Sequence, residues 1–398
     1  MALVTAPADV LAIAETLARA PLVAFDLEFA SADRLIPALC LIQVAWLDHV
    51  PLDAASGTIV PEIRLVDPIA VDVAPIVRVL AGHPLVVAHA PRQDLGLLAA
   101  RFGTAMTGLV DTQLAAAFAG IGDQVGLATL AGELLGITLA KEQQWTKWEA
   151  RPLTPEQLVY AEADVRHLPA LYAELAARLG ERLAWVRAES AQIVNDALAA
   201  ASVTPETAWR GVGGQRGLDP LAHSALQALA AWRQRVAAEL DRPLGQVLAD
   251  RVLVELSRAR PELGAIRSWK GLSPLARTRA TEIVSALAAA PPSEARDVPR
   301  TPSVRAQRWA EMLLAIVQVI AEDTGIAPRL LATRADAEEA ARVVDEGGLE
   351  AARELPAFST WRREVLGTAW EGWLAGRLGL VGDPAAPHGV RLAPRDPR

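Results

Sequence analysis

Acidic side chains form two short runs whose spacing suits a shared site. One run reads Phe-Asp-Leu-Glu-Phe at residues 25–29, and the other reads Tyr-Ala-Glu-Ala-Asp at residues 160–164. On a strand, Asp26 and Glu28 would point to the same face of the sheet. Their neighbours are apolar, and an unpaired carboxylate in such surroundings is costly. The first run therefore predicts a carboxylate pair with a strong partner, such as a metal ion.

Further residues complete this candidate site. Asp94 follows the strand-like residues 85–89, and Tyr160 and Asp164 would share one face of a helix because they are four positions apart. Four carboxylates in one site repel one another unless cations lie among them, and all-oxygen sites suit Mg²⁺ or Mn²⁺. The sequence thus predicts a two-metal phosphoryl-transfer enzyme whose two divalent cations, Mg²⁺ or Mn²⁺, are held by Asp26, Glu28, Asp94 and Asp164.

The elements that must position these residues are those of an α/β domain. Apolar runs predict strands at residues 22–30, 39–47, 63–67 and 85–89. Helical patterns fall at about residues 72–81, 92–102, 113–119, 127–135 and 155–178. Strands come first and then alternate with helices, which indicates a mixed sheet. Asp94 would open a helix, and Asp164 would lie in the middle of one.

The β pattern fades after about residue 200. Helical patterns then fill two blocks, bounded by stretches rich in Gly, Pro and polar residues. We expect a first domain over residues 1–205, helical modules over residues 215–292 and 303–382, and a disordered tail over residues 383–398. Residues 238–251 align without gaps on residues 321–334, which suggests a duplicated module. A chance match in an alanine-rich chain is the alternative.

Composition narrows the class of protein. The single cysteine, Cys40, leaves no intrachain disulfide or zinc finger. Asp9, Glu15 and Arg19 interrupt the apolar N-terminal residues, which argues against a secretory signal. No apolar run approaches the length of a membrane span. We expect a cytoplasmic protein without membrane association.

The net charge of −8 is unevenly distributed. Residues 1–200 carry a net charge of −10, residues 201–290 carry +4, and residues 291–398 carry −2. An acidic metal-dependent catalyst beside a basic module that binds a polyanion would show this pattern. Random drift in composition is the alternative, because the excess of four is small.

The order of the acidic motifs resembles the DEDD exonuclease superfamily, in its tyrosine-bearing branch. Asp26 and Glu28 match the first motif, Asp94 matches the second, and Tyr160 and Asp164 match the third. Two departures from the family pattern stand out. Leu27 replaces the usual threonine, and it should face away from the metals. Lys147 replaces the usual Asp or Asn before Trp148, which bears on substrate contacts.

More closely, four segments resemble the bacterial ribonuclease D family: residues 41–44, 110–113, 139–141 and 151–154. The middle helical block resembles the helicase-and-RNase-D C-terminal (HRDC) module, and the last block resembles a second, more divergent copy. The resemblance therefore implies an α/β ribonuclease H-like exonuclease domain, a mixed sheet with flanking helices, followed by two all-α HRDC-type modules.

The resemblance also implies roles for the motif residues. Asp26, Glu28 and Asp164 would hold one cation, and Asp26 would reach a second with support from Asp94. Tyr160 would orient the attacking water. The implied activity is 3′–5′ exoribonuclease cleavage that trims the 3′ ends of structured RNA, such as tRNA precursors, and releases nucleoside 5′-monophosphates. No obligate protein partner is implied.

Candidate substrate contacts depend on less specific patterns, and each has a structural alternative. They are His89, Lys141, Trp148, Arg267 and Lys270. The alternatives are a buried strand-end histidine for His89, aromatic packing for Trp148, and a solvated helical surface for the two basic residues of the middle block. Two other functions stay open. One is a DNA 3′–5′ exonuclease of the same superfamily. The other is a catalytically inactive nucleic-acid-binding protein, which the complete set of motif residues argues against.

Overall fold

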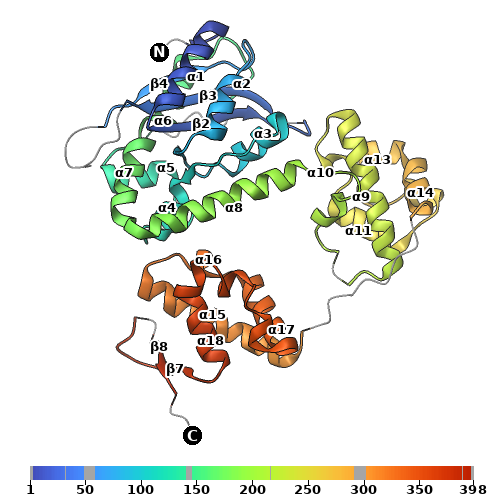
Figure 1. Cartoon of the computed structure of the whole chain (residues 1–398). Coiled ribbons are helices and arrows are strands. Elements are labelled where there is room, and N and C mark those ends of the chain that lie inside the picture. The colour runs from blue at the N-terminus through green and yellow to red at the C-terminus, as the bar shows by residue number, and fades with distance from the viewer. Residues whose placement is uncertain are drawn as a thin grey trace.

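The structure, a computed structural model, describes residues 3–31, 33–48, 59–139, 146–215, 217–290, 302–387 and 389–395. These residues form an α/β domain followed by two helical blocks (Figure 1). The sheet of the first domain has the order β1-β4-β3-β2-β5-β6. Its strands are β1 (Leu3–Val4), β2 (Leu22–Ala30), β3 (Ala38–Leu47), β4 (Glu62–Val66), β5 (Val86–Ala88) and β6 (Leu109–Asp111). β3 runs antiparallel to β2 and β4, whereas β2, β5 and β6 run parallel, so the predicted mixed sheet is confirmed.

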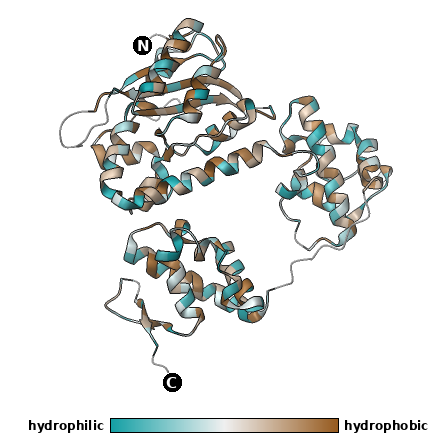
Figure 2. Ribbon diagram, in the orientation of Figure 1, coloured by the Kyte–Doolittle hydropathy of each residue, from teal (hydrophilic) through white to brown (hydrophobic). Residues whose placement is uncertain are grey.

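Helices cover both faces of this sheet. They are α1 (Pro7–Arg19), α2 (Ala74–Gly82), α3 (Arg92–Phe102), α4 (Thr112–Phe118), α5 (Leu127–Leu135), α6 (Pro155–Arg166), α7 (Leu168–Leu179) and α8 (Leu183–Ala201). Residues alternate along β2: Val23 and Phe25 join the core formed with α1, α2 and α3, whereas Ala24 packs against Val165 of α6 and Leu168 of α7. The strands are accordingly coloured mostly as hydrophobic in Figure 2.

The single helix predicted over residues 155–178 is in fact two helices. α6 ends at Arg166 and α7 begins at Leu168, with Pro169 in its first turn. Pro169 has no backbone N–H to donate to the carbonyl of Val165, four residues back, and its ring clashes with that carbonyl, so a continuous helix is interrupted. Asp164 therefore lies near the carboxyl end of α6 and not, as expected, in the middle of a helix.

The middle block has a core of its own. Its helices are α9 (Pro220–Leu240), α10 (Leu244–Val247), α11 (Asp250–Ala259), α12 (Leu263–Arg267), α13 (Pro274–Thr278) and α14 (Ala280–Ala288). Apolar side chains such as Leu229 and Leu253 form the centre of this block. Polar contacts reach the first domain: the Leu35 N–H donates to Asp241 Oδ1 over 3.1 Å, and Gln246 Nε2 donates to Asp33 Oδ1 over 2.8 Å.

The last block instead shares a hydrophobic core with the first domain. Its helices include α15 (Val304–Thr324), α16 (Pro328–Leu331), α17 (Arg334–Ala351) and α18 (Thr368–Leu374). The Trp361 ring stacks on Trp185 of α8 with centroids 5.2 Å apart, and it meets Phe118 of α4 edge-on at 5.0 Å. Arg362 forms a two-point ion pair with Glu189: Nη1 donates to Oε1 over 2.7 Å, and Nη2 donates to Oε2 over 2.9 Å.

The two helical blocks repeat one order of elements, at an offset that corrects the sequence alignment. α9 and α15 each have 21 residues. Both end at a residue in the left-handed conformation, Asp241 with φ 48° and Gly325 with φ 71°, which lie 84 positions apart. A four-residue helix follows in each block, and then an extended residue, Leu248 or Ala332. The sequence alignment placed residues 238–251 on residues 321–334, an offset of 83. That offset is wrong by one residue, because equivalent helix ends in the two blocks lie 84 positions apart.

The tail expected to be disordered contains a strand. β8 (Val390–Pro394) pairs antiparallel with β7 (Leu378–Gly382), and Leu380 and Leu392 pack against the shared core. Alternating apolar residues thus bury one face of the hairpin, and the expectation is wrong for residues 383–387 and 389–395. Within the described parts of the chain, no helix is long and apolar enough to cross a membrane.

Candidate active site

Three of the predicted metal ligands meet in one cluster. Asp26 and Glu28 lie on β2, and Asp164 lies on α6, which packs across this face of the sheet. One carboxylate oxygen from each residue can be chosen so that all three oxygens lie within 4.8 Å of one another. Leu27, between the two β2 carboxylates, is buried in the core on the opposite face, as expected. Because strand side chains alternate, Asp26 and Glu28 both point to the face of the sheet on which α6 packs.

Asp94 joins this cluster from the first turn of α3. Its carboxylate is close enough that its charge raises the pKa of both Asp26 and Glu28. Asp111 fixes the turn that leads into α3: its Oδ1 accepts the N–H of Ala90 over 2.9 Å and that of Gln113 over 2.8 Å. Ala90 has φ 52°, a left-handed conformation that non-glycine residues rarely adopt. Asp111 thus caps α4, and its second contact extends this role to the turn before Asp94.

Burial and mutual repulsion raise the pKa of each carboxyl in the cluster when no cation is bound. Burial, followed by the charges of Asp164 and Asp94, raises the pKa of Glu28 to about 9. Burial raises the pKa of Asp94 to about 7 and that of Asp164 to about 7. Burial and the neighbouring carboxylates also raise the pKa of Asp26 well above its ordinary value. A buried set of oxygen ligands that resists ionisation on its own fits divalent cations such as Mg²⁺ or Mn²⁺.

Tyr160 contacts the cluster from α6. Its hydroxyl lies close enough to the Asp164 carboxylate for each group to influence the pKa of the other. Burial, with the charges of Asp164, Glu28 and Asp26, raises the pKa of Tyr160 above its ordinary value, so the hydroxyl keeps its proton. Glu162, in the same acidic run, instead pairs with Arg166. The helix therefore presents Tyr160 and Asp164 to the site together, as their spacing predicts.

Other predicted substrate contacts have different placements. Trp148 is buried, with 4% of its surface exposed, and its ring centroid lies 6.2 Å from that of Tyr160. The ring shows the aromatic packing that was the alternative for Trp148, and its predicted substrate contact stays a prediction. His89 contacts the Thr112 hydroxyl through Nδ1 at 2.9 Å, and burial lowers its pKa to about 4. The His89 ring is consequently neutral near pH 7 and brings no positive charge.

Neither of the basic candidates that the structure describes lies close enough to the carboxylates to affect their pKa values. Lys141 lies outside the residues that the structure describes. Arg267 and Lys270 belong to the middle block, where both are exposed. Their predicted role in substrate binding stays a prediction.

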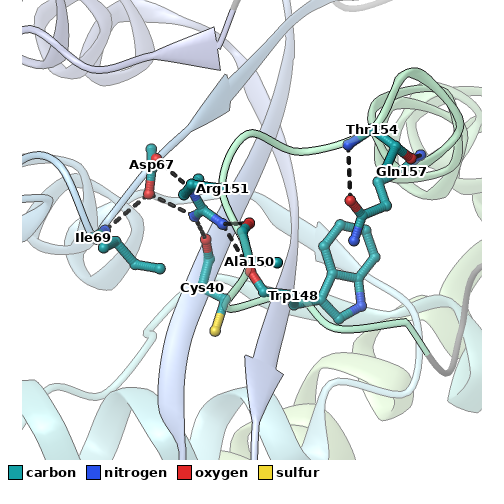
Figure 3. Close-up of polar contacts among 8 residues, drawn as sticks. All are labelled: Cys40, Asp67, Ile69, Trp148, Ala150, Arg151, Thr154 and Gln157. Carbon is teal, nitrogen blue, oxygen red and sulfur yellow. Dashed lines mark hydrogen bonds and ion pairs between the residues drawn. The ribbon is translucent and has the colours of Figure 1, made fainter.

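Sequence reasoning missed the residues that hold the third motif in place. Arg151 forms a two-point ion pair with Asp67, which is 3% exposed (Figure 3). Thr154 caps α6 in a reciprocal box with Gln157, whose amide also donates to the Thr146 hydroxyl over 3.2 Å. In the sequence, residues 151–154 resemble the ribonuclease D family but do not indicate these contacts. The only sequence signal for this arrangement is an arginine, Arg151, three residues before Thr154, the residue that caps the helix.

Known proteins match this chain over nearly all of its length. A family model described as 3′–5′ exonuclease matches residues 1–180, and the HRDC domain model matches residues 222–287. The curated ribonuclease D of Granulibacter bethesdensis is 33% identical over 378 residues, and that of Gluconacetobacter diazotrophicus is 34% identical over 377 residues. Each alignment covers 92% of this chain and 90% of the relative.

Solved structures agree with this assignment. RNase D of Escherichia coli, described as an exoribonuclease involved in structured RNA processing, aligns with a TM-score of 0.78 and 26% identity. That alignment covers 94% of this chain and 98% of the other. A protein from Bifidobacterium adolescentis shares the fold, with a TM-score of 0.65 and 22% identity. The curated ribonucleases D are about one-third identical to this chain, and the alignments cover 92% of this chain and 90% of each relative. The chain therefore belongs to the ribonuclease D family.

Proposed function

We propose that this protein is a metal-dependent 3′–5′ exoribonuclease that trims the 3′ ends of structured RNA and releases nucleoside 5′-monophosphates. The observation that carries the proposal is the partly buried carboxylate cluster of Asp26, Glu28 and Asp164, with Asp94 beside it, inside the region matched by the 3′–5′ exonuclease family. The Escherichia coli relative, described as acting in structured RNA processing, supports the RNA assignment. Precursors of tRNA are the substrate that the family resemblance implies.

The donor set supports a two-metal mechanism. The cluster offers only carboxylate oxygens, and their raised pKa values mean that cations would relieve a large mutual repulsion. Mg²⁺ or Mn²⁺ held by Asp26, Glu28, Asp94 and Asp164 would supply a hydroxide-like water and stabilise charge on the scissile phosphate.

The remaining steps belong to the protein's own side chains. Tyr160 is protonated and directs its hydroxyl toward the cluster. There it would hold the attacking water in line with the phosphorus, since positioning contributes much of the rate in such reactions. Arg267 and Lys270, exposed on the middle block, would bind the phosphate backbone upstream of the 3′ end.

The direct test uses RNA labelled at its 5′ end, a matched DNA and a circular RNA, each with Mg²⁺ or Mn²⁺. We expect single-nucleotide shortening of the linear RNA, release of nucleoside 5′-monophosphates, and no cleavage of the circle. Asp26→Asn should lower kcat on the order of 10³-fold, because a metal's charge stabilisation amounts to several kcal/mol. Glu162→Gln is the matched control on the same helix. It should leave the rate unchanged, because Glu162 pairs with Arg166.

Each alternative has its own outcome in this assay. Faster shortening of the DNA than of the RNA would assign a DNA exonuclease. Binding of RNA without release of any mononucleotide would assign a catalytically inactive binding protein. Full activity in Asp26→Asn would refute the metal ligands.

A further inference from the structure

Arg151 uses every N–H donor of its guanidinium group. Nε donates to Asp67 Oδ2 and Nη2 donates to Asp67 Oδ1, both over 2.6 Å. Nη2 also donates to the carbonyl of Cys40 over 2.7 Å. Nη1 donates to the carbonyls of Trp148 and Ala150 over 2.8 and 2.9 Å. An arginine has five such donors, so no N–H remains for another partner (Figure 3).

These acceptors lie on separate segments that together frame the carboxylate cluster. Asp67 directly follows β4. Cys40 lies where the pairing of β2 and β3 shifts register, between the partners of Glu28 and Phe29. A bulge of this kind redirects neighbouring side chains and is common beside active sites. Trp148 and Ala150 lie in the loop before α6. One side chain therefore joins β3, the strand paired with the one that carries Glu28, to the loop that leads to Tyr160.

The contact of this loop with Tyr160 is made by Trp148. Its ring is buried in a small cluster with Cys40, Leu153 and Ala161, and Tyr160 packs against that cluster. The rings of Trp148 and Tyr160 lie 6.2 Å apart at an interplanar angle of 41°. Since Arg151 donates a hydrogen bond to the Trp148 carbonyl, it fixes the backbone that carries the ring packed against Tyr160.

We propose that Arg151 is a positioning residue for the reaction: through Asp67 and the Trp148 loop, it fixes where the Tyr160 hydroxyl lies relative to Asp164. The catalytic part of this inference rests on the proposed exonuclease function. The structural part, that Arg151 sets the surroundings of Tyr160, stands independently of it. Lysine cannot replace Arg151, because an ammonium group lacks the planar fork that binds a carboxylate at two points.

The structural part can be measured without substrate or metal. The chain has only two tyrosines, Tyr160 and Tyr172, so labelling with 3-fluorotyrosine gives two ¹⁹F resonances, assigned with Tyr172→Phe. Arg151→Lys should move the Tyr160 resonance and leave that of Tyr172 in place. Arg362→Lys, which alters a comparable fork to Glu189 elsewhere in the chain, should leave the Tyr160 resonance unmoved. A folded Arg151→Lys protein with an unmoved Tyr160 resonance overturns the proposal, whatever its activity.

The catalytic part is tested by combining substitutions. Arg151→Lys should lower kcat about 10–100-fold with little change in KM, as is typical when the support of an active-site group is lost. In a Tyr160→Phe background the same change should lower kcat less than about threefold, because its route of action is already gone. Equal losses in both backgrounds would show that Arg151 acts on the fold alone and would overturn the proposal.

Asp67→Asn provides a second variant if Arg151→Lys does not fold. It keeps the arginine and the shape of its partner but removes the charge, and it should reproduce both the resonance shift and the loss of kcat in weaker form. An unmoved Tyr160 resonance in Asp67→Asn would again overturn the proposal. If the wild-type protein releases no mononucleotide, the proposed function fails, while the resonance measurement still decides whether Arg151 positions Tyr160.

Discussion

Asp26 stands directly opposite Gln43 in the antiparallel pairing of β2 and β3. Side chains of opposed residues point to the same face of a sheet, so the Gln43 amide lies on the face of the carboxylate cluster. Gln43 is fully buried, and neither its amide nitrogen nor its amide oxygen has a hydrogen-bond partner among the described residues. An unpaired polar group of this kind costs about 1–3 kcal/mol of folding free energy.

Gln43→Met should therefore raise the Tm of the metal-free protein. A side chain of similar length without polar atoms removes the desolvation cost, and a gain of 1 kcal/mol corresponds to roughly 2–4 °C in a domain of about 200 residues. Thermal unfolding in EDTA measures the change. Gln113→Met is the matched control: its amide donates to the Val125 carbonyl over 3.2 Å, so this substitution should lower the Tm. A lower Tm for Gln43→Met would contradict the prediction.

The metal-free protein should lose stability as the pH rises from 6 to 9. The folded-state pKa values of Asp94, Asp164 and Glu28, about 7, 7 and 9, lie above the ordinary values of 3.8 and 4.5. The folded protein then holds protons that the unfolded chain has already released, and the stability they give is lost as the pH passes through the raised pKa values. Tm measured in EDTA across this range tests the slope.

Added Mg²⁺ should flatten that slope, because the cation replaces the protons that neutralise the cluster. Glu28→Gln should flatten it without metal, since an amide does not ionise. A slope that is unchanged by both treatments would mean that the pH dependence arises elsewhere in the chain.

Asp111→Ala should weaken metal binding without touching a ligand. The substitution releases both the cap of α4 and the turn that directs Asp94. We expect a loss of about 0.5–2 kcal/mol in stability and of about 10–100-fold in Mn²⁺ affinity, measured by calorimetry. Asp219→Ala removes the corresponding cap of α9, where Asp219 accepts the Ala222 N–H over 2.8 Å. This control should lose stability but keep its Mn²⁺ affinity, and equal affinities in the two variants would refute the role of Asp111.

Trp361→Ala should destabilise the first domain and the last block together. The ring is 6% exposed and packs on Trp185 and Phe118 across the two parts. Truncation of a buried tryptophan costs about 3–5 kcal/mol, so differential scanning calorimetry should show a lower Tm for the unfolding transition of these two parts. The transition of the middle block, which has its own core, should stay in place. A shift of the middle block's transition would contradict the separation of the cores.

The sequence was sufficient for those parts of the site that depend on local periodicity. Asp26 and Glu28 share a face because strand residues alternate, and Tyr160 and Asp164 share one because helix residues four apart are neighbours. The mixed sheet follows from the order of apolar runs. The place of Asp94 after a strand-like run made it a candidate, and the family resemblance supplied the branch of the superfamily.

Long-range contacts lay beyond such reasoning. Arg151 and Asp67 are 84 positions apart, and no periodic pattern joins them. The packing of Trp148 against Cys40 is likewise a long-range contact that no periodic pattern predicts. Pro169 could have signalled the break between α6 and α7, because the helical hydrogen bond that it removes is a local one. The strand β8 was not predicted, because a tail rich in Pro, Gly and Arg indicates disorder. Its alternating apolar pattern is too short to outweigh that composition.

The shared core of the first domain and the last block has a topological consequence. Those two parts are separated in sequence by the whole middle block, yet Trp361, Trp185 and Phe118 place them in one hydrophobic interior. The middle block is therefore an insertion between two parts of one hydrophobic core, and we expect the described parts of the chain to unfold as two cooperative units. A chain divided between Ala290 and Pro302 would accordingly reassemble from its two pieces, and the protein can be built as a split enzyme.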